Sequence, residues 1–119
     1  MELSTKLYIL NDEGEKFMGA GVLWLLEGIM ETGSLLAASQ RMGLSYTKAR
    51  TMLDNLEKAL GRPMIDRKKG GAEHKGAELT PFAIEYMKLY KGFQDDVKAA
   101  AEDRFRKFMD ESMRLEVVR

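Results

Sequence analysis

The stretch Gly33–Gly61, GSLLAASQRMGLSYTKARTMLDNLEKALG, decides the fold of this chain. Ser34 and Ser45 are each placed to cap a helix, because a serine hydroxyl accepts a hydrogen bond from a free N–H of the first turn. Between them lies Gly43, a residue suited to the left-handed geometry in which helices end. The stretch therefore predicts a short helix over 35–42, a turn, and a longer helix that stops at Gly61. That order is typical of a helix-turn-helix.

The longer predicted helix, 46–60, has two different faces. Its apolar side chains recur at spacings of four, three and four and form one stripe for a core: Ala49, Leu53, Leu56 and Leu60. Its polar side chains are concentrated on the outside of the N-terminal half, the half of a recognition helix that meets base edges in the major groove. These are Tyr46, Thr47, Lys48, Arg50, Thr51 and Asn55. Glu57 is expected to point away from a duplex or toward water. An ordinary helical hairpin with a solvated face is the alternative.

The run 33–65 resembles the DNA-binding half of LysR-type regulators, with Gly-Ser opening one helix, a Gly-Leu turn, and Leu-Gly-x-Pro closing the next. The similarity to the N-terminal domain of ModE-type molybdate-responsive regulators is closer. It is carried by Glu31-Thr32-Gly33-Ser34, by Ser45-Tyr46, and by Gly70-Gly71 followed by Ala77-Glu78-Leu79-Thr80. Two features depart from that family: Ala49-Arg50 stands where it usually has Ala-Trp, and the segment 71–76 is poorer in glycine. The resemblance implies a winged helix-turn-helix regulator. Nothing matches the family's separate molybdate-binding domain, so we expect no cofactor and no molybdate site.

Composition limits the function classes. A chain of 119 residues with 45% apolar and 32% charged residues is expected to fold as one domain. It has no cysteine and a single histidine, His74, which excludes a disulfide framework and a zinc site. The most apolar run, 22–26, is too short to cross a bilayer, and we expect a cytoplasmic protein. No paired carboxylates and no nucleophile with a base are evident, so an enzyme is not expected.

The net charge is zero, but the charges are unevenly distributed. Residues 1–40 carry two lysines and six acids, and residues 76–119 carry eight basic residues and nine acids. Residues 41–75 carry nine basic residues and four acids. The positive charge therefore gathers on the helix-turn-helix and the segment after it, as expected for a local surface that faces DNA.

Two elements are expected before this region. Residues 6–10 and 15–18 flank the turn signal Asn-Asp-Glu-Gly and predict a small hairpin. Residues 22–32 predict a central packing helix that is buried on most sides. Its main face is Leu23, Leu26, Ile29 and Met30, widened by Val22, Trp24 and Leu25. Trp24 is expected in the core or in an interface rather than stacked on a ligand.

A wing is expected after the recognition helix. Residues 63–67 and 77–79 predict two short strands, and the basic loop between them contains several glycines. Wings lie along the sugar-phosphate backbone or enter the minor groove, where lysine and arginine meet negative potential. The glycine spacing matches no phosphate-binding loop.

From Thr80-Pro81 onward the sequence predicts one helix to about Met113, since threonine caps and proline suits the first helical position. Such a helix is about 45 Å long, so its far half cannot bury its apolar side chains against its own domain. We therefore expect a two-fold dimer through Phe82, Tyr86, Leu89, Phe93, Val97, Phe105 and Phe108. A break near Gly92 that folds the tail back is the alternative.

Together these patterns predict a mainly α fold with a small β component: a winged helix-turn-helix in 1–80 and a long dimerisation helix in 81–119, within one structural unit. The predicted partner is double-stranded DNA with an inverted-repeat operator, bound by a homodimer. The predicted DNA contacts are Ser34, Ser45, Tyr46, Thr47, Lys48, Arg50, Thr51, Arg67, Lys68, Lys69 and Lys75. Arg50 is the candidate for binding guanine bidentately, with phosphate as its alternative partner. The alternative function is a winged-helix protein–protein adaptor that does not bind DNA.

Overall fold

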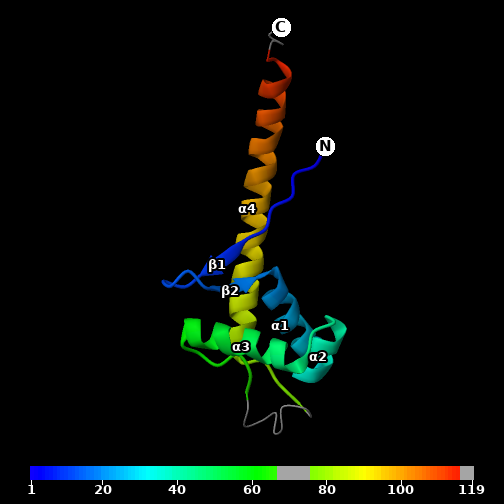
Figure 1. Cartoon of the computed structure of the whole chain (residues 1–119), viewed down its shortest axis with the longest axis vertical. Coiled ribbons are helices and arrows are strands. Elements are labelled where there is room, and N and C mark those ends of the chain that lie inside the picture. Colours follow the sequence, from blue (N-terminus) through cyan, green and yellow to red (C-terminus); the bar gives the residue numbers. More distant parts are fainter. Residues whose placement is uncertain (67–75, 116–119) are drawn as a thin grey trace. The chain divides into compact units, whose positions relative to one another are not determined.

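The computed structural model describes residues 1–66 and 76–115. Its internal contacts divide the chain into two units. Residues 6–88 form the first, which we call the body, and the second combines residues 1–5 with 89–119. In chain order the elements are β1 (Tyr8–Leu10), β2 (Lys16–Gly19), α1 (Ala20–Thr32), α2 (Leu35–Arg41), α3 (Tyr46–Leu60) and α4 (Pro81–Met113) (Figure 1). The mainly helical fold with a small sheet is as predicted.

The body begins with the predicted hairpin, in which β1 and β2 pair antiparallel. Asn11 closes its turn, because its side-chain Oδ1 accepts the N–H groups of Glu13 and Glu15 at 3.0 and 2.8 Å. The register places Ile9 opposite Met18, and Met18 is fully buried. The hairpin thus contributes one fully buried side chain, that of Met18, to the core.

α1 supplies most of the core of the body. Leu25, Leu26 and Ile29 are fully buried there, together with Leu35 of α2 and Leu53 and Leu56 of α3. Fully burying one such side chain stabilises a fold by about 1.5–3 kcal/mol. α1, α2 and α3 cross one another in the body, as a helix-turn-helix with its supporting helix requires (Figure 1).

The prediction that Trp24 and Met30 belong to the buried side of α1 was wrong. Trp24 is 60% exposed and Met30 is also exposed. Trp24 lies three residues before Glu27 and seven before Glu31, so it shares the polar side of α1 that carries these two acidic residues. The alternative for Trp24, a place in an interface, stays a prediction.

The crossing of α1 and α2 depends on small residues. Gly28 lies so close to Ala38 that a Cβ atom added to Gly28 would stand 3.0 Å from the Ala38 Cβ. Ala38 is itself buried. A residue with a Cβ at 28 would therefore press on Ala38 and require the two helices to shift.

Gly28→Val should lower the free energy of unfolding by about 2–3 kcal/mol, because overpacking forces the two helices apart. Adding Ala38→Gly should restore part of that loss by removing the atom that the new Cβ meets. Gly92→Val is the matched control, since Gly92 is also helical but has no atom within 4 Å of the added Cβ. Urea unfolding of the four proteins measures the effect; equal losses for Gly28→Val and Gly92→Val would contradict the close-packing explanation.

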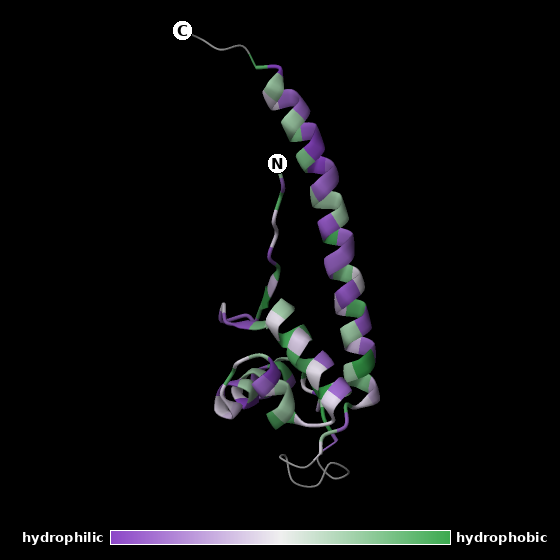
Figure 2. Ribbon diagram, turned by 90° about the vertical axis from the view of Figure 1, so that its right-hand side faces the viewer, coloured by the Kyte–Doolittle hydropathy of each residue, from purple (hydrophilic) through white to green (hydrophobic). Residues whose placement is uncertain are grey.

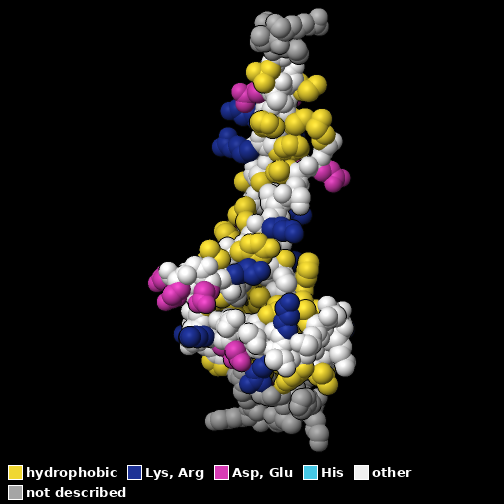
Figure 3. Space-filling view, viewed as in Figure 1, with side chains coloured by type: hydrophobic (Ala, Val, Ile, Leu, Met, Phe, Trp, Pro, Cys, Tyr) yellow, Lys and Arg dark blue, Asp and Glu magenta, His cyan; other side chains and the backbone are white. Residues whose placement is uncertain are grey.

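α4 is continuous over 33 residues. The predicted long helix is therefore confirmed, and the alternative of a break at Gly92 is excluded. Along its distal part, hydrophobic and hydrophilic residues alternate (Figure 2), and hydrophobic side chains lie on the surface (Figure 3). Leu89 is 72% exposed and Phe108 is 63% exposed. Among the described residues, no helix is long and apolar enough to span a bilayer.

Candidate nucleic-acid interface

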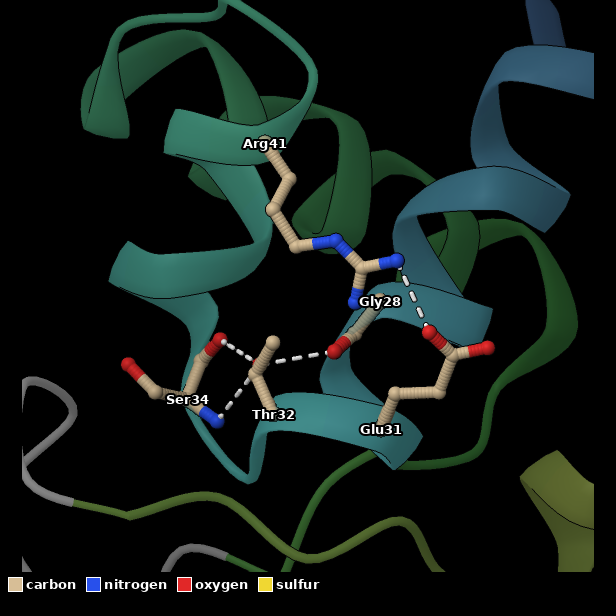
Figure 4. Close-up of polar contacts among 5 residues, drawn as sticks. All are labelled: Gly28, Glu31, Thr32, Ser34 and Arg41. Atoms are coloured by element: carbon tan, nitrogen blue, oxygen red, sulfur yellow. Dashed lines mark hydrogen bonds and ion pairs between the residues drawn. The ribbon is translucent and has the colours of Figure 1, made fainter.

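The helix-turn-helix starts at a tightly bonded junction between α1 and α2 (Figure 4). The Thr32 hydroxyl lies 2.7 Å from the Gly28 carbonyl oxygen and 3.0 Å from that of Ser34, and it accepts the Ser34 N–H at 3.2 Å. Ser34 Oγ in turn accepts the Ala37 N–H at 3.1 Å. The predicted cap is confirmed, and such a cap stabilises a helix by about 1 kcal/mol. The role of Ser34 toward a DNA phosphate stays a prediction.

Two contributors to this junction were not predicted from the sequence. They are the three hydrogen bonds of the Thr32 hydroxyl and the ion pair between Glu31 and Arg41. The carboxylate and guanidinium are 2.8 Å apart and join the end of α1 to the end of α2 (Figure 4). Both side chains are more than half exposed, so the pair contributes at most about 1 kcal/mol. The pair also neutralises Arg41, one of the basic residues that give 41–75 its positive charge.

The turn between α2 and α3 is short and closed by backbone bonds. Gly43 has a φ of +69°, which a residue with a Cβ rarely adopts, and the Leu44 N–H donates to the Ser39 carbonyl at 3.0 Å. Ser45 then caps α3, because its Oγ accepts the Lys48 N–H at 3.1 Å. The sequence predicted these features, and they hold α3 at a defined angle to α2.

α3 presents hydrogen-bonding side chains on the side opposite its core residues. Ala49 and Leu53 are fully buried, whereas Thr47, Thr51 and Asp54 are exposed. At about 100° per residue, these three lie within about 60° of one another on the outer side of the helix. We call Thr47, Thr51 and Asp54 the outer face of α3.

The other predicted contacts lie on the two flanks of this outer face. Lys48 and Asn55 line a surface groove of about 410 Å³ that also includes Tyr8 and Trp24. Lys48 is exposed on the flank that faces the hairpin. Tyr46 lies on the opposite flank and is half-buried rather than fully outward.

Arg50 is also half-buried and lies on the same flank as Tyr46. Its Nε donates to Asp54 Oδ1 at 3.2 Å, four residues further along α3. Arg50 was predicted as a contact residue without a partner, although a basic and an acidic residue four positions apart are a signal that can be seen without a structure. Asp54 is therefore a partner of a predicted contact residue that the predicted site did not include.

Glu57, predicted to point away from a duplex or toward water, is half-buried and bonded to the backbone. Its Oε2 accepts the Met64 N–H at 2.7 Å, and this bond ties the end of α3 to the segment that follows it. Met64 is fully buried, so a backbone N–H there needs a partner, and the carboxylate supplies one.

The base of the predicted wing is a single antiparallel bridge rather than two strands in the described residues. Ile65 pairs with Leu79, flanked by bonds from Asp66 N–H to the Glu78 carbonyl at 2.7 Å and from Thr80 N–H to the Met64 carbonyl at 2.9 Å. Thr80 also caps α4, because its hydroxyl oxygen accepts the Ala83 N–H at 3.1 Å. The segments on either side of the predicted wing loop, 64–66 and 78–80, are therefore paired with each other next to the end of α3.

The predicted wing contacts Arg67, Lys68, Lys69 and Lys75 lie outside the described residues, as does His74. Within residues 1–66 and 76–115, no group of three or more histidine or acidic side chains is arranged to hold a metal ion. The described part of the site therefore offers hydroxyl, amide, lysine and arginine donors, which suit phosphate oxygens and base edges.

Residues 23–83 match the family of bacterial regulatory helix-turn-helix proteins of the lysR type. The chain is 32% identical over 92 residues to the transcriptional regulator ModE of Haemophilus influenzae, covering 77% of this chain and 34% of that protein. It is 34% identical over 80 residues to the molybdenum-pterin-binding protein MopB of Rhodobacter capsulatus, covering 67% and 30% respectively. The chain spans about a third of the length of the curated relatives it matches. The predicted resemblance is thereby confirmed.

Solved structures agree on the fold. The DNA-binding domain of CbnR, solved in complex with DNA, superimposes with a TM-score of 0.59 at 22% identity and covers 77% of this chain and 99% of that one. The LysR family transcriptional regulator VV2_1132 superimposes with a TM-score of 0.55, also at 22% identity, over 70% of this chain and 27% of that one. The arrangement of α1, α2 and α3 is thus that of known helix-turn-helix domains.

Proposed function

Since the chain belongs to the lysR family of bacterial regulatory helix-turn-helix proteins, we propose that it is a dimeric, sequence-specific regulator of transcription. In this proposal it acts in the cytoplasm without catalysis or a cofactor. Two copies bind an inverted repeat in double-stranded DNA, with the two α3 helices in successive major grooves about 34 Å apart.

One observation carries the DNA-binding part of the proposal. The N-terminal half of α3 exposes donors and acceptors at Thr47, Lys48 and Thr51, while Ala49 and Leu53 behind them are fully buried. A helix held rigidly on one side, with short polar groups on the other, suits the major groove. The proposed contacts also include Ser34, Ser45, Tyr46 and Arg50, and, from the predicted wing, Arg67, Lys68, Lys69 and Lys75.

The dimer rests on the distal part of α4. Leu89, Phe93 and Phe108 are exposed there, and Val97 and Phe105 are only half-buried. At about 100° per residue, Leu89, Phe93, Val97 and Phe108 lie within about 100° of one another around α4, and Phe105 lies about 60° beyond Phe108. Phe82 and Tyr86, which belong to the body, fall in the same sector of the helix. Large apolar side chains on one side of a long helix are stabilised when a second helix covers them. In our proposal that helix is α4 of a second copy.

DNA selection from a random pool, followed by affinity measurements between 50 and 200 mM salt, tests the DNA-binding part. We expect the logarithm of affinity to fall linearly with the logarithm of salt concentration, with a slope near −0.9 for each neutralised phosphate. Lys48→Ala should weaken all sequences alike and make that slope shallower by about one.

Lys88→Ala is the matched control, because Lys88 is an exposed lysine of α4 paired with Glu85 at 3.6 Å and carries the same charge. It should leave affinity and slope close to those of the unaltered protein. No DNA binding at low salt, together with a protein partner that covers α3, would establish the adaptor function in place of this one.

A further inference from the structure

We propose that Asp54 is a specificity-determining positioning residue: its carboxylate holds the Nε of Arg50 and directs the guanidinium toward the edge of a guanine. This inference rests on the proposed function, because it concerns how α3 recognises DNA. It assigns the sequence preference of the protein to a pair of side chains rather than to Arg50 alone.

The positions of the two residues on α3 support this role. Arg50 starts from the half-buried flank, and its side chain is only 27% exposed, whereas that of Asp54 is 53% exposed. Asp54 belongs to the outer face of α3, with Thr47 and Thr51. The bond between Arg50 Nε and Asp54 Oδ1 therefore draws the guanidinium from the flank toward the side that carries the other hydrogen-bonding groups.

The chemistry of the guanidinium explains why this bond selects a base. The group is planar, with five N–H donors in a fixed geometry, so one bond at Nε restricts the plane of the whole group. Two parallel donors of a guanidinium match O6 and N7 of guanine in the major groove. A phosphate is less demanding, since it accepts a guanidinium from many directions. Restricting the plane before DNA arrives lowers the ordering cost for guanine in particular.

A purely stabilising role for the pair is the simpler explanation, and the structure argues against it. An acidic residue that precedes a basic one by four positions favours a helix more than the reverse order, and here the arginine comes first. Asp54 is also more than half exposed, and an ion pair that water screens at one of its two charges stabilises little. An acidic group on a surface that meets a polyanion lowers the affinity for every sequence. Its presence on the outer face of α3 is explained if it orients Arg50.

The test compares the unaltered protein with Asp54→Asn, Arg50→Ala, the double variant, and Asp103→Asn. Asp103 is the control, because it also forms an ion pair with an arginine of its own helix, Arg106, at 3.3 Å, but on α4 and with both side chains exposed. A selected operator and its single-base-pair variants identify the position whose preference Arg50→Ala abolishes. There, the unaltered protein should prefer guanine by about 5- to 150-fold.

Asp54→Asn should reduce that preference by about three- to tenfold, within the range of coupling between contacting side chains. The same variant should bind other sequences more tightly, because a negative charge is removed from the surface that faces DNA. Asp103→Asn should match the unaltered protein. The double variant should discriminate no worse than Arg50→Ala. Circular dichroism and thermal unfolding should be unchanged in Asp54→Asn.

Three outcomes would overturn the inference while leaving the proposed function intact. The first is that the preference for guanine survives Asp54→Asn, and the second is that it survives Arg50→Ala. The third is that Asp54→Asn lowers discrimination further in the Arg50→Ala background, because Asp54 would then contact a base directly. Failure of the unaltered protein to prefer any sequence would overturn the proposed function as well.

Discussion

Phe108→Asp should convert the proposed dimer into a monomer and weaken its binding to the proposed inverted-repeat operator by about 100-fold or more. Two linked half-site contacts exceed one contact in affinity by about 10²–10⁴-fold, and a monomer loses this advantage. Phe108 is already largely exposed within one chain, so a charged side chain there costs little unless a second helix covers it. Sedimentation velocity and fluorescence anisotropy with the operator measure the two effects.

Ala99→Asp is the control for that experiment. Ala99 is exposed on α4, on the side opposite the stripe that contains Phe93 and Phe108, and the substitution adds the same charge to the same helix. It should leave the protein dimeric and its operator affinity within a few-fold of the original. Dimers that persist in Phe108→Asp, or an equal loss in Ala99→Asp, would show that α4 does not join two copies through this stripe.

Leu53→Ala should have the largest effect on folding, lowering the free energy of unfolding by about 2–5 kcal/mol. Leu53 is fully buried where α3 meets the core, and alanine leaves a cavity that the neighbouring side chains fill only in part. The total stability of a small domain is about 5–15 kcal/mol, so the midpoint of thermal unfolding should fall by about 10 °C or more.

Lys58→Ala is the comparison, because Lys58 lies on the same helix but is exposed. Its effect on stability should stay within about 0.5 kcal/mol. Both variants are unfolded at one protein concentration, since assembly shifts the apparent midpoint. A loss below about 1 kcal/mol in Leu53→Ala would mean that α3 is held by its caps and turn rather than by the core.

Local signals in the sequence were sufficient for the helix-turn-helix itself. Ser34, Ser45 and Gly43 predicted the limits of α2 and α3, and Thr80 predicted the start of α4. These signals work because a cap or a left-handed turn is satisfied by residues within four positions along the chain. The same holds for the hairpin turn at Asn11. Periodicity alone was less reliable, as the exposed Trp24 shows.

The contacts between elements were decided only by the tertiary structure. Glu57 bonds to Met64 across seven residues, the Ala77 N–H donates to the Gly33 carbonyl across the body at 2.7 Å, and Gly28 meets Ala38 from another helix. None of these pairs has a recognisable spacing, because each depends on how the helices cross. The sequence alone therefore determined where α3 begins, where it ends and which of its sides is polar. Packing decided what lies beside that polar side, because a side chain finds its partner only after the core has fixed the angles between the helices.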